Sequence, residues 1–319
     1  MSLKNIQNQL IDPYGRVIHK LRVQLIDACN FRCFYCMPSN AKFFRPSELL
    51  TASELLHICS GLVDSGIDEI RISGGEPTIR KDFEEIVAGL SSLDLLKLGV
   101  TTNAVTLKSK LPFLKSTQCR YINISLDSLT KRGFYAITKT DEFHVAYDAI
   151  LKAKQMGFHV KVNVVLLKGV NDHEIFDFID FSAKQKIEVR FLELMKIGLH
   201  HDQHAKLFIS AQEIIERIEL RDKLTPQSMN CDSTSFNFRT LAGAQIGFIA
   251  SESQPFCCFC SRLRLTAQGV LRACLMVKKG INFRDKEKSE YPKLLQSVIA
   301  MKPTDRINSI AQPMYQIGG

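Results

Sequence analysis

The sequence contains no tryptophan, and none of its apolar runs approaches the roughly 18 residues that a bilayer-spanning helix needs. The first residues, MSLKNIQNQLIDPYGR, lack the apolar segment of a secretory signal peptide. We therefore expect no membrane association and a cytoplasmic location. The sequence also lacks a recognition-helix motif and a long basic run, which argues against a nucleic-acid-binding protein.

The HExxH pattern of a zinc-binding helix is absent as well. Three neighbouring histidines, His200, His201 and His204, have no carboxylate at the spacing of that pattern. We predict that they occupy a solvated loop and bind no metal.

What remains is an ordinary globular composition with a basic excess. The 319 residues are 45% hydrophobic and 24% charged, which is enough for a sizeable core and for about two domains. The formal net charge of +9 indicates an anionic ligand and does not bear on the fold.

Cysteine is unusually abundant for a chain without an export signal. In a reducing cytosol we expect these cysteines to bind metal rather than to form disulfides. Seven of the ten fall into two clusters, one near each end of the chain. The ten positions are 29, 33, 36, 59, 119, 231, 257, 258, 260 and 274.

Between residues 21 and 193, short β-rich runs alternate with helical patterns. Six βα units in a row predict parallel strands joined by right-handed crossovers. The predicted fold is α/β, an incomplete (β/α)6 TIM-type barrel over residues 1–195 with a C-terminal extension over residues 196–319 that carries a second metal cluster. The six strands are expected at 21–26, 68–73, 97–102, 121–126, 159–166 and 187–192.

Helix starts are marked by pairs with capping-box spacing. A helix is expected over 52–65, with Gly66 after its last turn. The pairs are Thr51 with Glu54, Asn171 with Glu174, and Ser210 with Glu213.

The predicted strands alternate polar and apolar residues, whereas strands covered on both faces would be apolar throughout. We expect the apolar set to face the helices and the polar set to face the interior of the barrel. Four cations of that set predict a cavity for an anion: Arg22, Arg71, Lys161 and Arg190. The competing interpretation is that Glu69 and Glu188, on the same strand faces, neutralise part of this charge.

The first cysteine cluster, CNFRCFYCMP, follows the first predicted strand with the spacing Cys29-x3-Cys33-x2-Cys36. Three thiolates suit zinc or an iron–sulfur cluster. A structural zinc site closes with four ligands, whereas a cubane held by three cysteines leaves one iron open. Cys59 is the remote candidate for a fourth zinc ligand, but it lies on the apolar face of a predicted helix, and we expect it in the core.

A second motif, ISGGEP at residues 72–77, ends the second predicted strand. Its two glycines let the backbone approach a ligand closely. An ordinary βα turn explains the motif equally well when it is considered alone.

The second cysteine cluster, PFCCFCSRLRLTAQG with a further cysteine downstream, again supplies three thiolates: Cys257, Cys260 and Cys274. Spacing alone leaves zinc open here. Cys258 could ligate in place of Cys257 or take no part. Arg262 and Arg264 follow the cluster and suit phosphate recognition, since guanidinium groups pair with phosphate oxygens.

The first motif, with Tyr35 in its aromatic position, resembles that of the radical S-adenosylmethionine enzymes. With the second cluster the resemblance narrows to the GTP 3′,8-cyclase family, lyases of the first step of molybdenum cofactor (molybdopterin) biosynthesis. It runs nearly end to end. It is carried by CNFRCFYCMP, IRISGGEP, TTN at 101–103, INISLDS, VKVNVV, EVRFLELM, FCCFCSRLRLTAQG and the final Gly318-Gly319.

The resemblance implies two 4Fe–4S clusters and S-adenosylmethionine as cofactors, and GTP as substrate. An external electron donor would reduce the first cluster, which would cleave S-adenosylmethionine to a 5′-deoxyadenosyl radical. This radical would remove H-3′ from GTP, and the resulting C3′ radical would attack C8 of guanine. The product, (8S)-3′,8-cyclo-7,8-dihydroguanosine 5′-triphosphate, would pass to a cyclic pyranopterin monophosphate synthase. A homodimer is compatible with the resemblance.

The family's site residues map onto this sequence position by position. Cys29, Cys33 and Cys36 match the ligands of the reductive cluster, and Cys257, Cys260 and Cys274 match those of the auxiliary cluster. The matched contacts to S-adenosylmethionine are Tyr35, Gly75, Ser125 and Met195. The matched contacts to GTP are Arg22, Arg71, Thr102, Lys161, Arg190, Arg262 and Arg264.

Three positions depart from the family pattern. Ala28 replaces a usual arginine, Ala104 a usual glycine, and Glu69 stands where the family often has lysine. The last change removes one expected triphosphate contact. The tail glycines of the family enter the active site, whereas on sequence alone Gly318-Gly319 is equally compatible with a frayed terminus.

Two other functions remain open at this point. One is another two-cluster radical enzyme, such as one that modifies peptides, whose substrate would not need a cation-lined interior. The other is a basic nucleic-acid-binding protein with two structural metal sites. GTP-dependent cleavage of S-adenosylmethionine separates the first from the cyclase, and zinc without iron would favour the second.

Overall fold

The computed structural model describes residues 9–38, 40–198 and 203–318. Its centre is a sheet in which six consecutive parallel strands are hydrogen-bonded in chain order. All six lie within two residues of the predicted positions, and the α/β class is confirmed. The strands are β3 (Lys20–Gln24), β4 (Glu69–Ser73), β5 (Lys97–Thr102), β6 (Cys119–Ser125), β7 (His159–Val165) and β8 (Glu188–Leu192).

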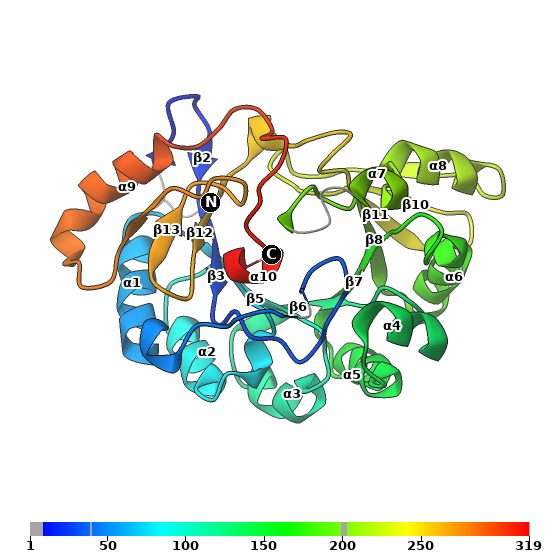
Figure 1. Ribbon diagram of the computed structural model, residues 1–319, viewed down its shortest axis with the longest axis horizontal. Coiled ribbons are helices and arrows are strands. Elements are labelled where there is room, and N and C mark those ends of the chain that lie inside the picture. The colour runs from blue at the N-terminus through cyan, green and yellow to red at the C-terminus, as the bar shows by residue number, and fades with distance from the viewer. Residues whose placement is uncertain (1–8, 39, 199–202, 319) are drawn as a thin grey trace.

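Helices cover the outer face of this curved sheet (Figure 1). They pack on the apolar side chains that alternate with polar ones along each strand, such as the buried Ile70 and Ile72 of β4. Cys59 lies in the same core, fully buried, as predicted. The helices are α1 (Ala52–Asp64), α2 (Phe83–Ser91), α3 (Leu107–Lys115), α4 (Lys131–Thr138), α5 (Phe143–Gln155) and α6 (Ile175–Gln185).

A helical segment begins at each of the three predicted starts, and a side-chain cap forms at two of them. Thr51 and Glu54 form a complete capping box on α1, and the Ser210 hydroxyl accepts from the amide of Glu213 at the start of α8 (Ala211–Glu219). Asn171 is the N-cap residue of a short 3₁₀ helix, Asp172–Glu174, that leads directly into α6, but its side chain makes no cap hydrogen bond. Its side chain accepts from the Leu167 amide and donates to the carbonyl of Asp127, so a long-range contact takes it away from the helix end.

The C-terminal extension adds strands to both sides of the six. On one side, β11 (Gln245–Ile249) pairs in parallel with β8, and on the other side β12 (Arg262–Leu265) pairs in parallel with β3. Antiparallel strands continue outward from these two, and the sheet has twelve strands in all among the described residues. The outer strands are β9 (Thr225–Gln227), β10 (Phe236–Arg239), β13 (Val270–Arg272) and β14 (Gly280–Asn282).

The remaining elements are short or peripheral. They are the hairpin β1 (Leu10–Ile11) and β2 (Val17–Ile18), α7 (His204–Leu207), α9 (Tyr291–Ile299) and α10 (Met314–Ile317). The prediction of a solvated loop is wrong for His204, which is buried with a ring nitrogen 2.7 Å from the Leu194 carbonyl. His200 and His201 lie outside the described residues. In the described part of the chain, every helix is too short or too polar to cross a membrane.

Candidate active site

The interior of the curved sheet holds two cavities. The upper cavity, of about 270 Å³, lies at the C-terminal ends of the strands, where Leu192 of β8 and Ile249 of β11 line it. The lower cavity, of about 400 Å³, lies at the N-terminal ends, where Lys97 of β5 and Glu188 of β8 line it. Arg190 borders both cavities.

The four predicted interior cations line these cavities. Arg22 borders the upper cavity, Arg71 and Lys161 border the lower one, and Arg190 borders both. Strand parity therefore identified residues that face the interior. Arg262 and Arg264 from β12 join Arg22 on the wall of the upper cavity.

Only part of this charge is neutralised. Glu188 lies 2.7 Å from the Nζ of Lys161 and 2.6 Å from the Nε of Arg190, as the competing interpretation expected. Glu69 instead lies 3.9 Å from the Nζ of Lys20. Arg22 and Arg71 have no ion pair among the described residues, and burial lowers the pKa of Arg22 well below its usual range and that of Arg71 to about 10. An anion in the cavity would relieve this cost.

The first cysteine triplet lies in the loop after β3, which is held against the end of α4. The amides of Arg32 and Phe34 donate to the carbonyls of Thr138 and Ile137. Burial, the Asp127 carboxyl and the thiols of Cys36 and Cys29 raise the pKa of Cys33 well above its usual range. The three sulfurs are thus close enough to influence one another.

The ISGGEP motif closes over this loop. A Cβ at Gly75 would lie 2.2 Å from the carbonyl oxygen of Ala28, so only glycine fits there. The buried Glu76 carboxylate accepts from the hydroxyl of Thr102 at 2.7 Å and from the amide of Asn103 at 2.6 Å. Thr102 therefore faces Glu76, and its neighbour Thr101 lines the upper cavity.

The remaining residues matched to S-adenosylmethionine contacts lie at the same end of the barrel. Tyr35 and Met195 line the upper cavity, and the Tyr35 hydroxyl donates to Asp127 at 2.6 Å. Ser125 ends β6 and is half-buried.

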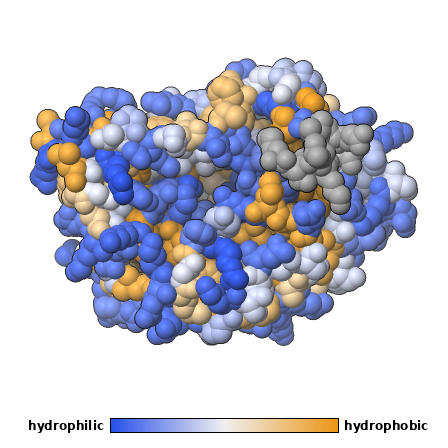
Figure 2. Space-filling view, turned by 180° about the vertical axis from the view of Figure 1, so that it is seen from behind, coloured by the Kyte–Doolittle hydropathy of each residue, from blue (hydrophilic) through white to orange (hydrophobic). Residues whose placement is uncertain are grey.

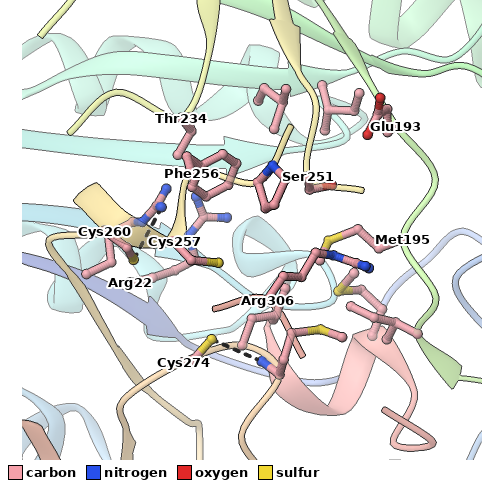
Figure 3. A pocket seen from close by; sticks show the side chains of 18 of the residues that line it. Arg22, Glu193, Met195, Thr234, Ser251, Phe256, Cys257, Cys260, Cys274 and Arg306 are labelled. Atoms are coloured by element: carbon pink, nitrogen blue, oxygen red, sulfur yellow. Dashed lines mark hydrogen bonds between the residues drawn. The ribbon is translucent and has the colours of Figure 1, made fainter. Parts of the chain in front are cut away.

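The second cysteine triplet opens into the same upper cavity as Cys36 of the first. Figure 3 shows the sulfurs of Cys257, Cys260 and Cys274 on one side of this cavity and Met195 on the other. Cys258 is exposed and does not line the cavity. The two clusters of the sequence, more than 200 residues apart, thus meet in space.

Lys302 is a site residue that the sequence did not reveal. It is buried, and its Nζ lies 3.3 Å from the Cys260 sulfur, 2.6 Å from the Arg262 carbonyl and 3.0 Å from the Ala273 carbonyl. No pattern around Lys302 marks it, because its partners come from other segments. Arg306, which lines the upper cavity and pairs with Glu252, was missed for the same reason.

The C-terminal segment reaches the inner side of the curved sheet, where Figure 1 shows α10 near the centre of the molecule. The carbonyl of Gly318 accepts from Arg264 at 2.5 Å, and the Gln24 amide donates to the Tyr315 carbonyl at 2.8 Å. Gly318 therefore contacts a residue of the cavity wall rather than fraying into solvent. Gly319 lies outside the described residues.

The chemistry of both donor sets is compatible with iron–sulfur clusters. Among the residues that the structure describes, no three histidine, cysteine, aspartate or glutamate side chains are placed to hold one metal ion. Each thiol triplet nevertheless converges, and N–H groups surround the sulfurs, such as Arg262 on Cys260 at 3.4 Å and Met276 on Cys274 at 3.5 Å. Three soft thiol ligands with N–H donors beside the sulfurs suit an iron–sulfur cluster.

In metal-free protein, we expect the rate of alkylation of Cys260 to increase with pH, with a midpoint at about pH 6. Burial opposes ionisation of its thiol, but Arg262 and Lys302 outweigh burial and lower the pKa to about 6. Lys302→Met should raise that pKa and slow alkylation of Cys260 by iodoacetamide at neutral pH, as peptide mass spectrometry would measure.

Lys278→Met, which removes an exposed lysine, is the matched control, and circular dichroism verifies the fold. An unchanged pH profile for Cys260 in Lys302→Met would contradict the assigned role.

Two family models match the chain over successive regions. The Radical SAM superfamily matches residues 23–182, and Molybdenum Cofactor Synthesis C matches residues 187–307. The first region contains the first cysteine triplet, and the second contains Cys257, Cys260 and Cys274.

Curated relatives match over most of their length. A protein of Synechocystis sp. named GTP 3′,8-cyclase is 43% identical over 310 residues, which is 97% of this chain and 95% of the relative. A mitochondrial GTP 3′,8-cyclase of Arabidopsis thaliana is 37% identical over 88% of this chain and 73% of its own. Streptococcus suis SuiB, solved bound to S-adenosylmethionine, superimposes with a TM-score of 0.67 at 15% identity, over 90% of this chain and 69% of SuiB, a likeness of fold.

Proposed function

The chain belongs to the GTP 3′,8-cyclase family of the radical S-adenosylmethionine superfamily, and from this membership we propose that its upper cavity cyclises GTP between two iron–sulfur clusters. It is a radical enzyme of molybdenum cofactor biosynthesis. One observation carries the assignment to this cavity: Cys36, the second cysteine triplet and Arg22, which forms no ion pair within the described part of the chain, all border the same space.

The cofactors divide between the two triplets. Cys29, Cys33 and Cys36 would hold one 4Fe–4S cluster, which supplies the electron for reductive cleavage of S-adenosylmethionine when it is bound. Cys257, Cys260 and Cys274 would hold the second cluster, on the C-terminal extension that follows the incomplete (β/α)6 TIM-type barrel. We assign contacts to S-adenosylmethionine to Tyr35, Gly75, Ser125 and Met195.

The protein's own contribution is to orient the nucleotide. A triphosphate held by fixed guanidinium groups keeps the ribose and base from rotating, which favours one hydrogen and one ring carbon as reacting atoms. We assign this role to Arg22, Arg71, Lys161, Arg190, Arg262 and Arg264. Thr102 would act indirectly, since its hydroxyl is donated to Glu76.

For Arg264 to bind a phosphate, its guanidinium would exchange the hydrogen bond that it now donates to the Gly318 carbonyl. Phosphate oxygens are stronger acceptors than a peptide carbonyl, so substrate can displace this contact. We further propose that an external donor reduces the cluster at the first triplet by one electron. A cyclic pyranopterin monophosphate synthase would then consume the product. The enzyme would act as a monomer or a homodimer.

The test is product formation by anaerobically reconstituted enzyme with S-adenosylmethionine and a chemical reductant. We expect 5′-deoxyadenosine and a cyclised nucleotide with GTP, and neither above background with ATP, CTP or a cysteine-containing peptide. Liquid chromatography with mass spectrometry measures both products.

Cys29→Ser is the control that should lose all cleavage of S-adenosylmethionine. Cleavage driven by the peptide and not by GTP would overturn the proposal in favour of a peptide-modifying enzyme.

A further inference from the structure

Lys302 is a buried lysine to which the proposed function gives no role. Lysines usually lie among hydrophilic surface residues, such as those that cover much of the face in Figure 2, where water screens their charge. Lys302 is 3% exposed and follows α9, where its amide donates to the Ile299 carbonyl at 2.9 Å. It does not line the upper cavity, so a nucleotide bound there would not touch it. Burial of such a group requires partners that replace the lost water.

The partners of Lys302 identify its protonated form. Its Nζ lies 2.6 Å from the Arg262 carbonyl oxygen, 3.0 Å from that of Ala273 and 3.3 Å from the Cys260 sulfur. An ammonium group has three N–H donors, one for each of these acceptors, whereas a neutral amine would turn its lone pair toward one of them. Burial lowers the pKa of Lys302, and the adjacent Cys260 acts in the opposite direction. The contacts therefore fit an ammonium cation beside a thiolate.

No carboxylate among the described residues neutralises this cation. The charged groups that act on Lys302 are Cys260, Cys274 and Arg262. Arg262 also lies beside Cys260, but it lines the upper cavity, where the phosphates of the substrate would bind it. The charge of Lys302 has no anion to act on other than the thiolates of the second triplet.

A cation beside a cluster ligand favours the form of the cluster that carries the additional electron. The reduction potential of an iron–sulfur cluster depends on net charge and on hydrogen bonds to its sulfurs. One added electron is one added negative charge, which a buried ammonium group attracts with little screening. At the first triplet, burial and the Asp127 carboxyl instead raise the pKa of Cys33 well above its usual range. The two sites therefore differ in the sign of the charge beside their sulfurs.

We propose that Lys302 is a positioning residue for the second cluster, and that its ammonium group, acting through Cys260, raises the reduction potential of a cluster bound there. This inference rests on the proposed function, because it takes the second triplet as a cluster site. Lys302 itself gives up neither an electron nor a proton. One electron enters the cluster from the reductant, and the ammonium group keeps its three contacts.

The experiment is an anaerobic redox titration of reconstituted enzyme, followed by electron paramagnetic resonance. Cys29→Ser, Cys33→Ser and Cys36→Ser together remove the first cluster, so the remaining signal belongs to the second. In this background, Lys302→Met and Lys302→Gln should shift the equilibrium toward the oxidised cluster by about tenfold, a fall in potential of about 59 mV for one electron. Lys302→Arg, which keeps the charge, should stay within about twofold of that equilibrium in the parent.

Two controls show that the effect is local. Lys278→Met removes an exposed lysine four residues after Cys274 and should leave the potential unchanged. The first cluster, observed alone in Cys274→Ser enzyme, should keep its potential when Lys302→Met is added, because Lys302 contacts none of its ligands.

Each outcome decides the role of Lys302. If both neutral variants lose the second cluster and Lys302→Arg keeps it, the charge is needed even to hold the cluster, and the proposal stands. An unchanged potential in the neutral variants would overturn it, as would an equal change of potential or of iron content in all three variants. If wild type holds no second cluster, the proposed function fails as well; if it holds two and cyclises GTP, only the role of Lys302 is in question.

Discussion

Cys274→Ser should abolish formation of the cyclised nucleotide while cleavage of S-adenosylmethionine continues at a reduced rate. Cys274 lines the upper cavity beyond β13, opposite Met195, and the first triplet does not depend on it. Three thiolates are the minimum that hold a cubane with an open iron, so the loss of one should release the second cluster. Iron and sulfide should fall from about eight to about four of each per chain.

The control for this variant is Cys258→Ser. Cys258 is adjacent to Cys257 in sequence but exposed and outside the cavity wall. We expect its iron content and product yield to match wild type. Full product formation by Cys274→Ser would show that the second triplet is not a cluster site, and equal losses in both variants would mean that the cysteine ligands are assigned wrongly.

Gly75→Ala should weaken binding of S-adenosylmethionine by about a hundredfold without unfolding the protein. The added Cβ would lie 2.2 Å from the Ala28 oxygen and 2.5 Å from the Asp27 oxygen. Both are backbone atoms that cannot rotate away, so the ISGGEP loop must move away from the first cysteine loop. Equilibrium dialysis with labelled S-adenosylmethionine measures the effect, and circular dichroism verifies the fold.

Gly169→Ala separates this steric effect from backbone strain. Gly169 has a φ of +73° and no heavy atom within 4 Å of an added Cβ, so alanine there costs only the roughly 1–2 kcal/mol of a left-handed residue. We expect wild-type binding of S-adenosylmethionine in this variant. Wild-type binding in Gly75→Ala would show that the loop does not contact the cofactor.

The barrel strands could be predicted because their information is local. A two-residue period of apolar side chains sets both the position of a strand and which residues face inward. Arg71 and Arg190 were assigned to the interior by this rule, and they line its cavities. The Thr51 cap was predictable for the same reason, since its partner Glu54 lies three residues away in the sequence.

The rest of the site depends on contacts that no local pattern encodes. Lys302 reaches Cys260 across 42 residues, and Asn171 bonds to Asp127 rather than capping its own helix. Thr101 lines the upper cavity, whereas the hydroxyl of Thr102, the position matched to a GTP contact, donates to Glu76. The family itself was predictable, and relatives 43% and 37% identical confirm it.

The pairing of β11 with β8 and of β12 with β3 has a consequence for protein engineering. A chain cut near residue 195 would expose the ladder edges of β3 and β8, and bare parallel edges invite aggregation. The parts of the chain before and after residue 195 therefore form one sheet. A chimaera that exchanges either part between homologues must therefore preserve both strand pairings, β11 with β8 and β12 with β3.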